Sequence, residues 1–87
     1  MTEPEITIFR SARRHKISDE RMLYALKTCP KPFDHPFRTG QRIFLAPDRK
    51  GIPLEVVAVV YDDGSMDIIH AMKLRTKYKP KYREVMG

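Results

Sequence analysis

Residues 54–72, LEVVAVVYDDGSMDIIHAM, carry the clearest structural pattern in this 87-residue chain. Residues 54–61 are rich in valine and apolar on both faces, which predicts a strand at the centre of a sheet. Asp62-Asp63-Gly64-Ser65 is the strongest hairpin turn in the sequence, and residues 66–72 form the strand expected after it. The fold is therefore expected to be organised around an antiparallel hairpin.

Further strands are expected before this hairpin. Residues 42–46 have the composition of a strand, and residues 47–51 have the turn chemistry that connects it to the central strand. Residues 33–37 are interrupted by Pro36 and predict at best an irregular edge strand. Together these segments predict an antiparallel meander.

The N-terminal third is expected to contain the helices. Residues 6–9 are a short β-type run, and residues 11–15 predict one or two helical turns. Ser18 is a good N-cap, and the two acidic residues after it occupy the first turn, where the helix dipole favours anions. Apolar residues then recur at helical spacing until Pro30, which predicts a helix over 19–28.

This order of elements predicts an α+β fold. Two short N-terminal helices are expected to pack on one face of a roughly four-stranded antiparallel sheet, and the chain is expected to end in a basic segment. The other face of the sheet would then be partly open, as a ligand surface can be. Residues 1–87 are expected to form a single domain, because a chain of this length supports one small core.

Composition excludes several classes of protein. The single cysteine excludes an intramolecular disulfide framework and the cysteine clusters of structural zinc sites. The longest apolar run, residues 56–60, is far shorter than the roughly 20 residues that span a bilayer. The first residues are acidic, where a signal peptide would be basic. We therefore expect a cytoplasmic protein with no membrane partner.

Nearly all of the net charge of +6 lies at the C-terminal end. Residues 1–72 hold eleven Lys or Arg and ten Asp or Glu, whereas residues 73–87 hold six and one. From Lys73 to Arg83 a cation occupies every odd position, so an extended chain would place all six on one side and a helix would distribute them around its surface. Pro80 argues against an uninterrupted helix over 77–83. This asymmetry favours a polyanion partner; the alternative is a solvated tail.

Tyr78 and Tyr82 alternate with these cations. Tyrosine rings stack on unpaired bases while Lys and Arg neutralise phosphates, a combination typical of single-stranded RNA sites. The alternative is that both rings pack on the core. Arg13-Arg14-His15 is a second basic cluster, which is either part of the same surface or a solvated helix face.

Three histidines are the candidates for proton transfer near neutral pH. His70 follows Ile68-Ile69 and leads into the basic segment, which is a suitable position for an active group on a sheet surface; the alternative is a structural hydrogen-bonding role. His35 lies in a proline-rich connection and is expected to be solvated. The histidines lack metal-ligand spacing, and no nucleophile or phosphate-loop motif is present, so no metal or cofactor is expected.

Two stretches resemble the BrnT-type toxins, small proteins of bacterial type II toxin–antitoxin systems with a fold like that of the RelE ribonucleases. Arg13-Arg14-His15-Lys16-Ile17-Ser18-Asp19-Glu20 is similar to that family's opening, RKHGVS…E. Residues 48–57 and 68–73 are similar to its later motif, G-R-L-L-V-V…I-I-S-A-R-K. Lys16 stands where the family has a glycine suited to a left-handed backbone, and His70 stands where it has serine. Either the chemistry has moved to His70 or catalysis has been lost.

The resemblance implies an RNA-directed toxin, a metal-independent endoribonuclease that acts on mRNA and is neutralised by a cognate antitoxin protein. It implies His70 as the acid or base, with Lys73 and Arg75 stabilising the charge on the phosphorane. The residues expected to contact the substrate are Arg13, Arg14, Tyr78, Lys79, Tyr82 and Arg83. No small-molecule substrate is expected. The alternative is a non-catalytic nucleic-acid-binding or protein-interaction module that uses the same basic C-terminal edge.

Overall fold

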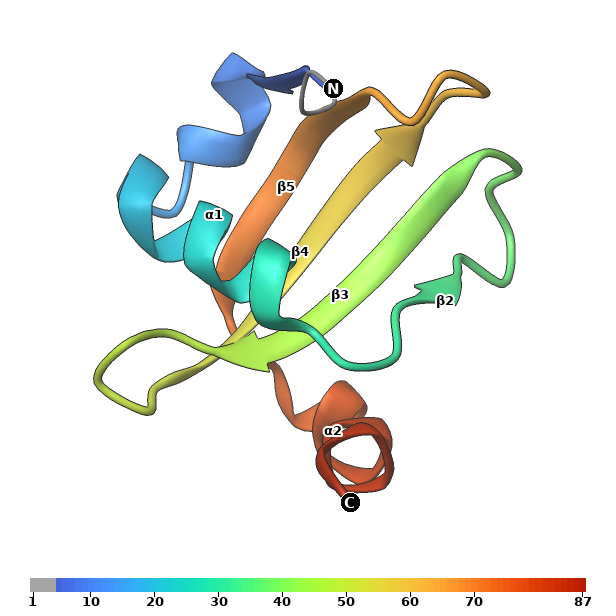
Figure 1. The fold of residues 1–87 in the computed structure, drawn as a ribbon. Helices are drawn as coiled ribbons and strands as arrows, with labels where there is room; N and C mark the ends of the chain where they lie inside the picture. Colours follow the sequence, from blue (N-terminus) through green and yellow to red (C-terminus); the bar gives the residue numbers. More distant parts are fainter. Residues whose placement is uncertain (1–4) are drawn as a thin grey trace.

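The computed structural model describes residues 5–87, and a five-stranded mixed sheet lies at its centre (Figure 1). The sheet has the order β1-β5-β4-β3-β2. Its strands are β1 (Ile6–Ile8), β2 (Phe33–Asp34), β3 (Gln41–Pro47), β4 (Pro53–Val60) and β5 (Met66–Lys73). The helices are α1 (Asp19–Thr28) and α2 (Lys79–Met86), preceded by the 3₁₀ turns η1 (Arg10–Arg13) and η2 (Thr76–Tyr78).

Two local predictions are confirmed. The valine-rich strand β4 lies in the middle of the sheet, antiparallel to both of its neighbours. Helix α1 has the expected bounds, because the hydroxyl of Ser18 accepts a hydrogen bond of 3.3 Å from the backbone N–H of Arg21 and caps its first turn.

The predicted architecture of two N-terminal helices on a four-stranded antiparallel sheet is wrong. The N-terminal residues add a fifth strand, because β1 pairs with β5 in parallel, with Ile6 opposite Met66. The first expected helix is the single 3₁₀ turn η1, which ends before Lys16 takes a left-handed conformation with φ of 59°. The second helix, α2, lies at the C-terminus (Figure 1).

The C-terminal cations do not form an extended row. Lys73 ends β5, and the chain then continues through η2 into α2. Pro80 is compatible with this helix because it lies in the first turn, where its missing N–H would have no helical partner. Tyr78 and Tyr82 pack against the sheet, as the core-packing alternative predicted.

The sheet has an apolar cluster on each face. The larger cluster lies beneath η1 and α1 and includes Met22, Leu54, Val56 and Ile68. The smaller cluster consists of Ile43, Leu45 and Val57, with side chains from the C-terminal segment packed against it. Figure 1 shows the two helices well separated. Among residues 5–87, no helix is long and apolar enough to cross a membrane.

A β-bulge in β5 determines which side chains reach the second face. His70 lies opposite Val57 and Ile68 lies opposite Ala58, so Ile69 is an extra residue in the ladder. Ile68 and Ala71 belong to the larger cluster, whereas Ile69 packs on the smaller one and His70 contacts Glu55. The bulge therefore directs two consecutive side chains, Ile69 and His70, to the same face.

Candidate functional site

A buried carboxylate, Glu55, lies at the centre of the second face of the sheet. Its side chain is fully buried in β4, between the apolar residues of the same strand. Arg75 binds it through the backbone N–H at 2.9 Å and through the guanidinium, with Nη2 2.6 Å from Oε2 and Nε 3.0–3.1 Å from both oxygens. His70 completes the set, with Nε2 3.1 Å from Oε2. A buried charge is tolerated only when it is paired in this way.

These contacts keep Glu55 ionised. Burial raises the pKa of the carboxyl group, but the hydrogen bonds from His70 and Arg75 outweigh it and lower the pKa to about 2. An ionised carboxylate can only accept hydrogen bonds, so Nε2 of His70 must carry the hydrogen. In neutral His70 the lone pair then lies on Nδ1, which is free to accept a proton.

A cleft of about 360 Å³ lies above this ion pair. It brings together η2, the middle of β4 and β5, and the loop between β2 and β3. Its lining residues are His35, Arg38, Gln41, Val57, Ile69, His70, Arg75, Lys77 and Tyr78, and we call it the histidine cleft. The lining contains three cations and no carboxylate. Arg38 and Lys77 form no ion pair within residues 5–87, so the cleft carries a net positive charge.

The second histidine of the cleft, His35, is held in the opposite tautomer. Its Nδ1 accepts a hydrogen bond of 3.1 Å from the backbone N–H of Phe37, so in the neutral ring Nε2 carries the hydrogen. The cleft therefore presents one imidazole whose free nitrogen is an acceptor, His70, and one whose free nitrogen is a donor, His35. Phe37 itself is 90% exposed, with its ring centroid 6.3 Å from that of His35.

The third histidine, His15, lies against His70. Their ring centroids are 5.6 Å apart in an edge-to-face arrangement. The hydroxyl of Ser11 donates a hydrogen bond of 2.7 Å to the carbonyl of Ile69, which fastens η1 to the bulged part of β5. The left-handed turn at Lys16 follows immediately after His15. The structure thus brings together histidines that are far apart in the sequence.

The structure groups only part of the predicted site. His70, Arg75 and Tyr78 line the histidine cleft. Lys73 faces a separate pocket near the N-terminal end of α1. Arg75 is the partner of Glu55, so much of its charge is already balanced.

The other predicted contacts are dispersed. Arg13 is engaged with Asp19, at 2.9 Å, and Arg14 lines a shallow depression beside η1. Lys79 and Arg83 are exposed on α2, whereas Tyr82 is partly buried against the smaller apolar cluster. These side chains do not line the histidine cleft.

The sequence did not predict that one site would bring together Glu55, His35, Arg38 and Lys77. Glu55 offered a signal, because a single carboxylate within LEVVAVV must find a partner if the strand is buried on both faces. Nothing local in the sequence indicates that residues 35–38 approach β5, because that contact depends on the strand order of the whole sheet.

Comparisons with known proteins identify no relative of this chain. No family model, no curated protein and no solved structure matches it.

Proposed function

We propose that the protein acts on RNA and cleaves its backbone in the histidine cleft. The observation that carries this proposal is the pairing of two histidines with opposite free nitrogens in a cleft that has unpaired cations. Cleavage next to a ribose 2′-hydroxyl requires a base for that hydroxyl, positive charge near the phosphate and an acid for the leaving oxygen. The lining of the cleft includes candidates for all three.

His70 is the proposed base. Ionised Glu55 accepts the Nε2 hydrogen and fixes the ring, which leaves Nδ1 to take the proton of the 2′-hydroxyl. The 2′-oxygen then bonds to phosphorus and the bond to the 5′-oxygen breaks, which gives a 2′,3′-cyclic phosphate. Arg38 and Lys77 would stabilise the phosphorane. His35 would return a proton from Nε2 to the leaving 5′-oxygen once its ring is protonated, a state in which Nδ1 carries a hydrogen and no longer accepts from the N–H of Phe37. Lys73 has no role in this scheme because it lines another pocket.

One exposed aromatic side chain favours an unpaired RNA strand as the substrate. Phe37 projects into solvent from the loop that carries His35 and Arg38, whereas the ring of Tyr78 packs on the smaller apolar cluster with Arg75 and Lys77 over it. An aromatic ring beside unpaired cations can stack on a base while the cations contact the phosphates. The resemblance to BrnT-type toxins supports mRNA as the target and an antitoxin protein as the partner that covers this surface.

The test is cleavage of a 5′-labelled single-stranded RNA by the purified protein. We expect products that end in a 2′,3′-cyclic phosphate and no cleavage of the same oligonucleotide made with 2′-deoxyribose. His70→Asn should abolish cleavage while the protein stays folded, because the amide can still donate to Glu55 but cannot take the proton. Arg83→Ala, on the exposed side of α2, is the matched control and should cleave normally.

The second candidate function is RNA binding without cleavage, which the basic and aromatic lining alone would support. It predicts that the wild-type protein binds the oligonucleotide in a salt-sensitive manner and leaves it intact on a gel. Absence of both binding and cleavage would contradict both functions.

A further inference from the structure

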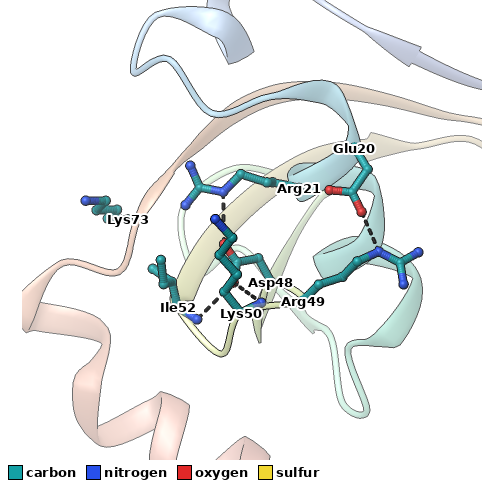
Figure 2. Close-up of a pocket in the computed structure, with 7 residues that line it drawn as sticks. All are labelled: Glu20, Arg21, Asp48, Arg49, Lys50, Ile52 and Lys73. Carbon is teal, nitrogen blue, oxygen red and sulfur yellow. Dashed lines mark hydrogen bonds and ion pairs between the residues drawn. The ribbon is translucent and has the colours of Figure 1, made fainter.

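We propose a second anion site, separate from the histidine cleft, that binds a phosphate monoester dianion. It is a pocket of about 310 Å³ between the first turn of α1, the β3–β4 turn and the end of β5 (Figure 2). The charged residues that line it are Glu20, Arg21, Asp48, Arg49, Lys50 and Lys73, and we call it the lysine pocket. This proposal does not depend on the proposed RNA cleavage.

Asp48 is a buried carboxylate that lines the lysine pocket. Its side chain is almost fully buried, and Oδ1 accepts hydrogen bonds of 2.9 Å from the backbone N–H groups of Lys50 and Ile52. Oδ2 accepts from Nε of Arg21, also at 2.9 Å. Burial raises the pKa of Asp48, but these hydrogen bonds outweigh it and lower the pKa, so the carboxylate stays ionised. Three protein donors bind this carboxylate, and its role is to hold Arg21 and the turn in place.

The guanidinium of Arg21 has donor capacity that the protein does not use. Nη2 is buried and finds no acceptor within residues 5–87. In Figure 2 the guanidinium extends toward Lys73, and the Lys50 side chain reaches toward the same space. A buried N–H group without an acceptor is unfavourable, and Nη2 is closed to solvent as it stands, so an anion in the pocket would satisfy it after a shift of the guanidinium.

The charges of the lysine pocket define the ligand. Arg49 turns away from Arg21 and pairs with Glu20 at 2.6 Å (Figure 2), and Arg21 pairs with Asp48. Lys50 and Lys73 form no ion pair within the described part of the chain, which leaves two unbalanced positive charges beside the guanidinium. A phosphate monoester carries close to two negative charges at neutral pH and accepts several hydrogen bonds, so it matches both features.

The first experiment titrates inorganic phosphate into the ¹⁵N-labelled protein at constant ionic strength. We expect saturable shifts of the backbone amides of Lys50, Ile52 and Lys73. Lys50→Met and Lys73→Met should each weaken binding about tenfold, the loss expected from one charge-assisted contact. Arg83→Gln is the matched control, because Arg83 is exposed on α2 and does not line the lysine pocket, and it should change the affinity less than about twofold.

Shifts that do not saturate, or an equal loss of affinity in Arg83→Gln, would overturn the proposal. Lys77→Met tests whether the phosphate enters the histidine cleft instead; it should leave the amide shifts of the lysine pocket unchanged, and their loss would contradict a separate site.

A second set of titrations identifies the source of the phosphate. Adenosine 5′-monophosphate should bind and adenosine should not. An RNA with a 5′-phosphate is then compared with the same RNA ending in a 5′-hydroxyl. Tighter binding of the phosphorylated RNA that Lys50→Met abolishes would identify the RNA end as the ligand. Equal binding of the two RNAs, with phosphate still bound, would identify a free phosphate compound.

Discussion

The buried side chains on the two faces of the sheet are stabilised in different ways. On the face beneath η1 and α1, Leu54 and Val56 of β4 pack among apolar side chains. On the opposite face, the residue between them, Glu55, is equally buried but is held by charge. Leu54 and Glu55 are adjacent in sequence but contribute to stability differently. Leu54 does so by burying hydrocarbon on one face, and Glu55 by forming a fully hydrogen-bonded ion pair on the other.

The difference explains why the candidate site is on the second face. The apolar cluster there contains only three buried residues, and α2 packs near β3 rather than over the middle of the sheet. Space is therefore left above Glu55 for a cleft, and two of the polar side chains that line it, His70 and Arg75, are oriented by this buried carboxylate. A closed apolar face gives rigidity, whereas an incompletely covered one can bind a ligand.

The largest expected effects come from removing these two neighbours. Leu54→Ala and Glu55→Ala should each destabilise the protein by about 3 kcal/mol, the first through a cavity and the second through loss of the ion pair with Arg75 and of the hydrogen bond with His70. Chemical denaturation measures both values. Equal and large losses would confirm that the two faces contribute comparably.

A double-mutant cycle with Arg75→Ala separates the two mechanisms. Arg75→Ala should cancel part of the loss in Glu55→Ala, because it removes the charge left without a partner, and should add independently to Leu54→Ala. Simple additivity in both pairs would show that Glu55 is not stabilised by Arg75.

The second prediction concerns how the free energy of unfolding changes at acidic pH. The pKa of Glu55 falls from 4.5 to about 2 on folding, so its contribution to stability is complete above the unfolded value and is lost as pH falls from 4.5 toward 2. This loss amounts to about 3 kcal/mol and is the same interaction as above, not an addition to it. Glu55→Gln should flatten the acid limb of the stability profile, whereas Leu54→Ala should shift the whole profile without changing its slope.

The sequence predicted the elements that depend on local patterns, but not the strand pairing that depends on distant contacts. The valine pattern of β4, the Ser18 cap and the spacing within 19–28 act over a few residues, and the elements they predicted are present. The parallel pairing of Ile6 with Met66 depends on contacts between distant segments. A local pattern cannot encode it, which is why the predicted sheet lacked its fifth strand.

The candidate site shows the same limit. His70 was identified because it leads from a strand into the basic segment, a suitable position for an active group, but its orientation depends on the bulge at Ile69. Pro80 was weighed against an uninterrupted helix over 77–83, and the α-helix indeed begins only at Lys79, so that Pro80 lies in its first turn, where proline is tolerated. His35 and Arg38 join the cleft only through the pairing of β2 with β3 and of β3 with β4, which no nearby residue indicates.

The third prediction tests whether the open face binds bases. Phe37→Ala should weaken binding of single-stranded RNA by about 1–3 kcal/mol, because a base loses its stacking partner. Because Phe37 is 90% exposed, stability should change by no more than about 0.5 kcal/mol. Phe9→Ala, at another exposed phenylalanine, is the control and should leave RNA affinity unchanged. An equal loss in both variants would contradict a specific contact at the cleft.

The smallest expected effect separates the charge of the cleft from the charge of the chain as a whole. Arg38 and Lys77 are the lining cations that form no ion pair with residues 5–87, so each should neutralise one RNA phosphate. Arg38→Ala and Lys77→Ala should each reduce the slope of log affinity against log salt by about 0.7, the value for a contact with a single strand. Lys27→Ala, exposed at the end of α1, changes the net charge equally and should leave the slope unchanged. If all three variants lower the slope alike, RNA is attracted by the net charge of the protein. The cations of the histidine cleft would then make no specific contact with RNA phosphates.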